Sequence, residues 1–153
     1  MNKEVSKVIS SIKQCSKEVF TELGAGWQEA IYQGAMEVSL RHRGLMYETQ
    51  RILPITFKDH VVGESKPDLV VWIKKDAKKI AIVVDLKADT GVKEEHEVQV
   101  RRYIQELKKQ THKRGEEVCD TGLLINFFKE AASKKIHDGV EDMNGVQILE
   151  IRT

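Results

Sequence analysis

The N-terminal part of the chain follows a helical pattern of apolar and polar positions. Between residues 4 and 23 apolar residues recur with the spacing of one buried helix face: Val5, Val8, Ile9, Ile12, Val19 and Leu23. Gly24 is a natural end for this helix. A second helix is expected from about Trp27 to Arg43, ended by Gly44. The chain therefore begins with two amphipathic helices.

After Gly44 the pattern changes to that of β-strands. Residues 51–65, RILPITFKDHVVGES, predict two short strands with a turn at Lys58–Asp59. Residues 68–87, DLVVWIKKDAKKIAIVVDLK, predict a longer hairpin that turns at Lys75–Asp76. Two consecutive hairpins are therefore expected in the middle of the chain.

The C-terminal half returns to helix and strand in alternation. Residues 94–110 have a helical pattern, and 121–127 and 146–152 predict two more strands. The expected buried face of this helix consists of Val100, Ile104 and Leu107. The order is α-α-β-β-β-β-α-β-β, with room for a further helix before the last strand. This order predicts one α/β domain over residues 1–153, in which helices flank a mixed sheet.

Composition limits the classes of protein that the chain can belong to. With 25 basic and 24 acidic residues, a nucleic-acid partner could only be attracted by a local patch. No run of 18 or more apolar residues is present, which argues against a membrane protein. The N-terminus lacks the apolar core of a signal peptide, and two cysteines are few for a secreted scaffold. We therefore expect a reduced, intracellular protein.

The segment VVDLKAD places charges inside the most strand-like part of the sequence. Strand side chains alternate between faces, so Asp85 and Lys87 project to one side and Leu86 to the other. The hairpin folds Asp68 back to lie opposite this segment. Two carboxylates and a lysine are therefore expected to meet at one strand end.

This group of charges has two interpretations. Two nearby carboxylates repel each other unless a cation lies between them. A site with few protein oxygens and several waters suits Mg²⁺ or Mn²⁺, which polarises a phosphoryl oxygen and activates a bound water. The alternative is a surface Asp–Lys ion pair between strands, which is common and weak. The hairpin residues alone leave both interpretations open.

Four motifs in order along the chain resemble one family. PDLV and DLK resemble the P-D…(D/E)-x-K signature of the PD-(D/E)XK nuclease superfamily. Residues 26–32, GWQEAIY, match G-x-x-E-x-x-Y, the motif that names the GxxExxY proteins within it. Residues 96–104, HEVQVRRYI, resemble the H-E-x-Q-x-x-x-Y segment of these proteins, and GLLINF resembles their following strand. The resemblance implies a restriction-endonuclease-like core.

The resemblance also implies roles for the charged residues. Asp68 would bridge the metal ion, and Asp85 would be a second ligand beside the Leu86 carbonyl. Lys87 would position the attacking water or stabilise charge on the phosphate. A glutamate at the position of Glu29 completes the acidic cluster in similar nucleases, directly or through a metal-bound water. The alternative is that Glu29 only interacts with the helix dipole.

Five further residues each have a structural and a functional interpretation. Tyr32 packs in the core, with a hydroxyl that could hold a carboxylate. Asp89 is a solvated charge or a metal ligand at the rim, and His96 is structural or part of the site. Gln99 and Tyr103 share a helix face and resemble the Q-x-x-x-Y element of recombination-type exonucleases. In those enzymes the glutamine contacts the active site and the tyrosine contacts the nucleic-acid strand. The alternative is an exposed polar pair.

Basic residues are concentrated on and just after the helix that carries Gln99: Arg101, Arg102, Lys108, Lys109, Lys113 and Arg114. Such a patch beside a metal site suits a phosphate backbone, although charge runs are also common on solvated helix faces. We therefore expect a Mg²⁺- or Mn²⁺-dependent nuclease that cleaves DNA. A non-cleaving nucleic-acid-binding module and a plain scaffold are the alternatives. The expectation of a homodimer, which would present two active sites to a nucleic-acid duplex, rests on analogy with the superfamily alone.

Overall fold

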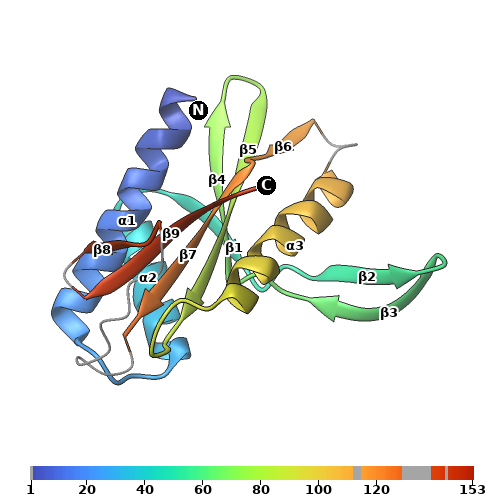
Figure 1. The fold of residues 1–153 in the computed structure, drawn as a ribbon. Helices are drawn as coiled ribbons and strands as arrows, with labels where there is room; N and C mark the ends of the chain where they lie inside the picture. Colours follow the sequence, from blue (N-terminus) through green and yellow to red (C-terminus); the bar gives the residue numbers. More distant parts are fainter. Residues whose placement is uncertain (1, 112–114, 129–138, 144) are drawn as a thin grey trace.

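A mixed β-sheet forms the centre of the molecule, with helices on both faces (Figure 1). The computed structural model describes residues 2–111, 115–128, 139–143 and 145–153. The elements in chain order are α1 (Lys3–Leu23), α2 (Glu29–His42), β1 (Met46–Thr49), β2 (Leu53–Phe57), β3 (His60–Ser65), β4 (Leu69–Lys75), β5 (Lys78–Lys87), α3 (Glu94–Thr111), β6 (Glu116–Val118), β7 (Thr121–Phe127), β8 (Glu141–Met143) and β9 (Val146–Arg152).

The sheet has the strand order β1-β4-β5-β7-β9-β8, and β6 also pairs with β5. Strand β5 pairs antiparallel with β4 and parallel with β7, so the sheet is mixed. The predicted α/β class with a restriction-endonuclease-like arrangement is confirmed. The long central strand β5 places its C-terminal end between β4 and β7, which is where the DLK segment lies.

Alternation along β5 divides the core into two layers. Ile82, Val84 and Leu86 belong to the layer that packs against α1 and α2. Ala81 and Val83 belong to the layer on the opposite face, under α3. Successive strand residues point to opposite faces, so Asp85 continues the face of Val83 and lies on the α3 side. This confirms the predicted separation of Asp85 from Leu86.

Both predicted N-terminal helices are present; α1 ends at Leu23 as predicted, whereas α2 begins at Glu29, two residues after the expected Trp27, and ends at His42. The Asn2 side chain accepts a hydrogen bond from the Glu4 amide (2.8 Å) and so caps the first turn of α1. Gly24 ends α1 with φ +72°, a conformation that favours glycine. The apolar faces of both helices are buried on the sheet, including Ile12 and Met36, which have no exposed surface.

Helix α3 packs closely onto β7 at Gly122. A Cβ at Gly122 would lie 2.8 Å from Cγ1 of Val100 and 3.2 Å from the Val83 carbonyl oxygen. Any larger residue would therefore push the helix away from the sheet. Because α3 lies this close to β5 and β7, its N-terminal half comes next to Asp85.

Strands β2 and β3 form a separate hairpin that projects from the body beside α3 (Figure 1). Its turn residues Lys58 and Asp59 have φ values of +48° and +64°. Two successive positive φ values are typical of a type I′ turn, whose twist matches that of the two strands. The turn predicted at Lys58–Asp59 is confirmed.

Some features differ from the sequence-based expectations or extend them. The short strands β1, β6 and β8 were not predicted, because three or four residues carry too little periodicity. The helix allowed before the last strand falls mostly on residues outside the described part of the chain. Cys15 and Cys119 are both free thiols. Within the described ranges, no helix has the length and apolarity that a membrane span requires.

Candidate active site

The registers of β4 and β5 bring Asp68 and Asp85 together. Leu69 is paired with Val84, so Asp68, which directly precedes β4, lies opposite Asp85. Oδ2 of Asp68 accepts a hydrogen bond from the Leu86 amide (2.8 Å), which fixes the carboxylate across the strand end. The Gln33 side chain of α2 donates to the Asp68 carbonyl oxygen (3.4 Å). The predicted pair of carboxylates is therefore present and held by backbone contacts.

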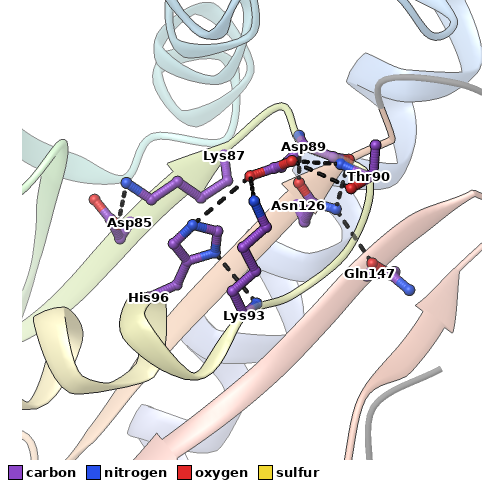
Figure 2. A network of polar contacts seen from close by, with 8 residues as sticks. All are labelled: Asp85, Lys87, Asp89, Thr90, Lys93, His96, Asn126 and Gln147. Carbon is purple, nitrogen blue, oxygen red and sulfur yellow. Dashed lines mark hydrogen bonds and ion pairs between the residues drawn. The ribbon is translucent and has the colours of Figure 1, made fainter. Parts of the chain in front are cut away.

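Asp85 is a buried carboxylate with an unsatisfied oxygen. Only 1% of its surface is exposed, and in the described part of the chain its Oδ2 accepts no hydrogen bond. Nζ of Lys87 lies 3.4 Å from this oxygen, an ion pair that is too long for a strong hydrogen bond (Figure 2). The pKa of Asp85 is raised to about 8: burial is the largest cause, the neighbouring Asp68 adds to it, and Lys87 offsets part of the increase.

These two carboxylates suit a hard divalent cation. A buried carboxylate oxygen without a partner is costly, and a bound cation would remove that cost. Among the residues that the structure describes, no three Asp, Glu, His or Cys side chains are placed to hold a metal ion together. Mg²⁺ is commonly held by one or two carboxylates, with water and substrate phosphate completing its shell. The residues present therefore fit such an ion with a small protein ligand set.

Glu29 lies at the edge of the carboxylate pair. It is the first residue of α2, and its side chain is exposed. Partial desolvation raises its pKa, the Lys87 charge lowers it, and the charges of Asp68 and Asp89 raise it. Glu29 therefore shares the electrostatic field of the site without forming a three-carboxylate cluster. Its role as a metal ligand stays a prediction.

The rest of the GWQEAIY segment fixes the chain that leads into α2. The hydroxyl of Tyr32 donates to the Gly24 carbonyl oxygen (2.6 Å) and accepts from the Trp27 amide (3.3 Å). Its ring is buried and stacks on Phe127 with 4.4 Å between ring centroids. Gly26 has φ +99°, which favours glycine. Tyr32 therefore packs and anchors this loop, and its hydroxyl bonds backbone groups instead of a carboxylate.

A groove runs along the N-terminal half of α3, next to the carboxylates. This α3 groove is lined by Ser65, Glu95, His96, Val98, Gln99, Arg102 and Tyr103. Tyr103 is 5% exposed, and burial and then the charges of Asp85 and Asp68 raise the pKa of its hydroxyl. The tyrosine therefore lies within the field of the acids, and Gln99 lines the groove beside it.

The structure separates the predicted basic residues into two groups. Arg102 is exposed in the α3 groove, and no ion pair to it is found in the described ranges. Three others each lie in an ion pair within the chain: Arg101 with Glu97 (4.0 Å), Lys108 with Asp120, and Lys109 with Glu106 (3.0 Å). Lys113 and Arg114 lie outside the described residues. Arg102 is therefore the predicted basic residue best placed to meet a phosphate.

Sequence reasoning did not identify Asn126, which holds the chain just after the DLK segment (Figure 2). Its fully buried carboxamide accepts from the Asp89 amide (2.9 Å) and donates to the Asp89 carbonyl oxygen (3.1 Å). The same group donates to Oε1 of Gln147 (3.2 Å). An asparagine inside an otherwise apolar strand was the available signal, because a buried amide needs partners.

Asp89 joins this clamp to the start of α3. Its Oδ2 lies 3.1 Å from Nζ of Lys93 and 3.8 Å from Nε2 of His96 (Figure 2). Burial raises the pKa of Asp89, but hydrogen bonds from Thr90 and Lys93 outweigh burial and leave it lowered. Burial, with the Lys87 charge, lowers the pKa of His96. Asp89 therefore stays charged and paired at the rim, with His96 neutral beside it.

A family model of the PD-(D/E)XK nuclease superfamily matches residues 6–138. The chain therefore belongs to this superfamily of nucleases. No curated protein and no solved structure matches it. The matched region contains the carboxylate pair, Lys87 and the α3 groove.

The raised pKa of Asp85 makes the stability of the metal-free protein depend on pH. The pKa of this carboxyl is 3.8 in the unfolded chain and about 8 in the folded chain. Between these values the folded state binds more protons, so the free energy of unfolding falls as pH rises. We expect metal-free Asp85→Asn to gain stability over the wild type as pH rises through this window. Thermal unfolding in chelator at a series of pH values measures the difference.

Asp59→Asn is the matched control, because Asp59 lies exposed at the hairpin turn. This variant should differ from the wild type by the same small amount at every pH. A difference in stability between Asp85→Asn and the wild type that stays constant from pH 3.8 to about pH 8 would contradict the burial argument.

Proposed function

We propose that the protein is a metal-dependent nuclease that hydrolyses phosphodiester bonds in DNA, with Mg²⁺ or Mn²⁺ as its ion. The observation that supports this most is the buried, unsatisfied Oδ2 of Asp85 beside Asp68 and Lys87. DNA as the substrate rests on analogy with the superfamily. The GWQEAIY segment supports a place among the GxxExxY proteins of that superfamily.

The metal ligands are proposed to be Asp68, Asp85 and the Leu86 carbonyl, with Glu29 bonded to a metal-bound water. The N–H and C=O of a strand residue point to the same neighbouring strand. Because the Leu86 N–H points to Asp68, its carbonyl opens on the same side, beyond the last pair of β4 and β5. The ion would supply an activated water and polarise the phosphoryl oxygen.

Lys87, Gln99 and Tyr103 are proposed to act on the phosphate and the water. The ammonium of Lys87 lies beside the Asp85 carboxylate, where it would orient the water and offset negative charge that develops on the phosphoryl oxygens. The Gln99 amide lines the groove and can donate to a phosphate oxygen. The nearly buried Tyr103 is proposed to contact the substrate DNA strand with the edge of its ring that faces the groove.

A non-cleaving binding module is the alternative with the same fold. A module that only binds phosphates gains nothing from a carboxylate that repels them. Keeping Asp85 buried beside a second acid also lowers stability, because its charged form is desolvated. The cost is explained if the carboxylate holds a metal ion, which supports the nuclease over the module.

Cleavage should require both the metal ion and the two carboxylates. We expect the purified protein to cut labelled DNA with Mg²⁺ or Mn²⁺, and not in excess chelator. Asp68→Asn and Asp85→Asn should each abolish cleavage because each removes a metal ligand. Gel assays with linear, circular, single-stranded and branched DNA, and with RNA, measure this. Equal cleavage in chelator, or wild-type cleavage by either variant, would contradict the proposal.

Lys87 should contribute to the chemical step and not to metal binding. We expect Lys87→Ala to lower kcat by about 10²-fold, the range found when one preorganised stabilising group is lost. Metal affinity, measured by titration calorimetry, should stay the same or rise, since the substitution removes a positive charge that repels the metal ion. A loss confined to KM would instead identify Lys87 as a phosphate-binding residue.

Arg102 should contribute more to the binding of DNA phosphates than Arg101. In an Asp85→Asn background, Arg102→Ala should weaken DNA binding and reduce the salt slope by about one, because one phosphate contact is lost. Arg101→Ala is the matched control, since Arg101 pairs with Glu97. Fluorescence anisotropy over a range of salt measures both variants. Equal effects of the two substitutions would contradict a path through the α3 groove.

A further inference from the structure

The hairpin of β2 and β3 exposes more apolar surface than its own packing explains. Ile55, Phe57, Val61 and Val62 are 43%, 64%, 66% and 63% exposed. A two-stranded hairpin has only marginal stability by itself, and exposed apolar side chains add nothing to it. Such a group of side chains marks a surface that another molecule covers.

The base of the hairpin is fixed to α3 and to the candidate active site. Leu53 is fully buried in the core layer under α3. The Gln110 side chain of α3 donates to the Ile52 carbonyl oxygen (2.9 Å) and accepts from Nε of Arg51 (3.0 Å). Ser65, the last residue of β3, lines the α3 groove three positions before Asp68. The hairpin is therefore a fixed wall of the site.

Strand register identifies which side of the hairpin continues the groove. Paired residues share a face, and faces alternate along each strand. Alternation along β2 places Leu53, Ile55 and Phe57 on one face, with their partners Ser65, Gly63 and His60. Thr56 and its partner Val61 have the opposite face, because the register shifts between Ile55 and Thr56 and leaves Val62 as an extra, unpaired residue in β3. We call the exposed part of the first face, formed by Ile55, Phe57 and His60, the arm face. It lies on the same side of the hairpin as Ser65, which lines the α3 groove, and we call the groove together with this face the extended groove.

The two walls of this extended groove have complementary chemistry. Exposed Arg102 on α3 has no ion pair in the part of the chain that is described. The arm face is apolar and aromatic, and Nζ of Lys58 lies 5.6 Å from the centroid of the Phe57 ring. A polymer with an anionic backbone on one side and flat apolar groups on the other matches both walls. A single strand of nucleic acid has this arrangement.

We propose that the arm face stacks on unpaired bases a few nucleotides away from the scissile phosphate, and that the substrate is single-stranded or frayed beside the cut. The position of that phosphate rests on the proposed function. In a duplex the flat faces of the bases are hidden, and base edges offer polar groups that Ile55 and Phe57 cannot hydrogen-bond. Unpaired bases expose the faces on which an aromatic ring stacks.

Binding to two labelled DNAs of the same sequence, one single-stranded and one a blunt duplex, tests this inference. The measurements use fluorescence anisotropy in the Asp85→Asn background, so that neither DNA is cut. Phe57→Ala should weaken binding of the single strand roughly tenfold, as expected when one base–aromatic stack is lost. Binding of the duplex should change little. Phe57→Trp should retain affinity and Phe57→Leu should not, because leucine keeps apolar area without a ring.

Val61→Ala is the matched control. Val61 is as exposed as Phe57 but lies on the opposite face, so its loss should leave affinity unchanged. With Asp85 restored, Phe57→Ala should raise KM for a single-stranded substrate and leave kcat unchanged. Phe57 is largely solvent-exposed, so the fold should tolerate these substitutions.

Three results would overturn the inference. Affinity that does not change in Phe57→Ala would exclude stacking, and equal losses for the single strand and the duplex would exclude unpaired bases. A wild-type dimer that Phe57→Ala dissociates in analytical ultracentrifugation would show that a second copy covers the arm face. If the wild type cuts no nucleic acid but Phe57 still controls single-strand affinity, the nuclease proposal fails, and the stacking of unpaired bases on the arm face stands without it.

Discussion

The structure of the candidate site depends on one electrostatic constraint, the burial of the Asp85 carboxylate beside Asp68. Neither acid can move away, because strand register places Asp68 opposite Asp85 and the Leu86 amide holds it there. The charged form of Asp85 is destabilised by burial, and Lys87 compensates it only in part. In the metal-free protein a proton compensates this charge below about pH 8, and a bound cation would take its place, which would connect the stability of this strand end to metal binding.

Apart from the Leu86 amide that bonds Asp68 and the Lys87 ammonium beside Asp85, the contacts around this pair hold backbone groups. Gln33 bonds the Asp68 carbonyl, Asn126 bonds both backbone groups of Asp89, and Tyr32 fixes the loop before α2. Positions at strand and helix ends are thereby fixed, while Oδ2 of Asp85 accepts no hydrogen bond from the described residues. Fixed positions with available oxygens are what metal-assisted hydrolysis requires, since little reorganisation is then needed in the reaction.

The charges on α3 show why counting basic residues overestimates a nucleic-acid surface. Arg101, Lys108 and Lys109 are each compensated by an acid of the same chain. Arg102 differs, because it faces the groove that also contains Gln99 and leads to the carboxylates. In the proposal, the exposed apolar residues of the arm face on the β2–β3 hairpin lie on the same side as Ser65, which lines that groove. Affinity would then come from a few groups that line one path.

The sequence by itself determined the main elements of the fold and the central residues of the site. Helix faces, hairpin turns and the approach of Asp68 to Asp85 follow from periodicity and from short-range pairing, which are local properties of the chain. Only the tertiary structure shows that no described group donates a hydrogen bond to Oδ2 of Asp85, that Asn126 bonds the backbone of Asp89 and that Arg102 lines the α3 groove. These properties depend on distances between residues far apart in sequence, and no local pattern encodes such distances.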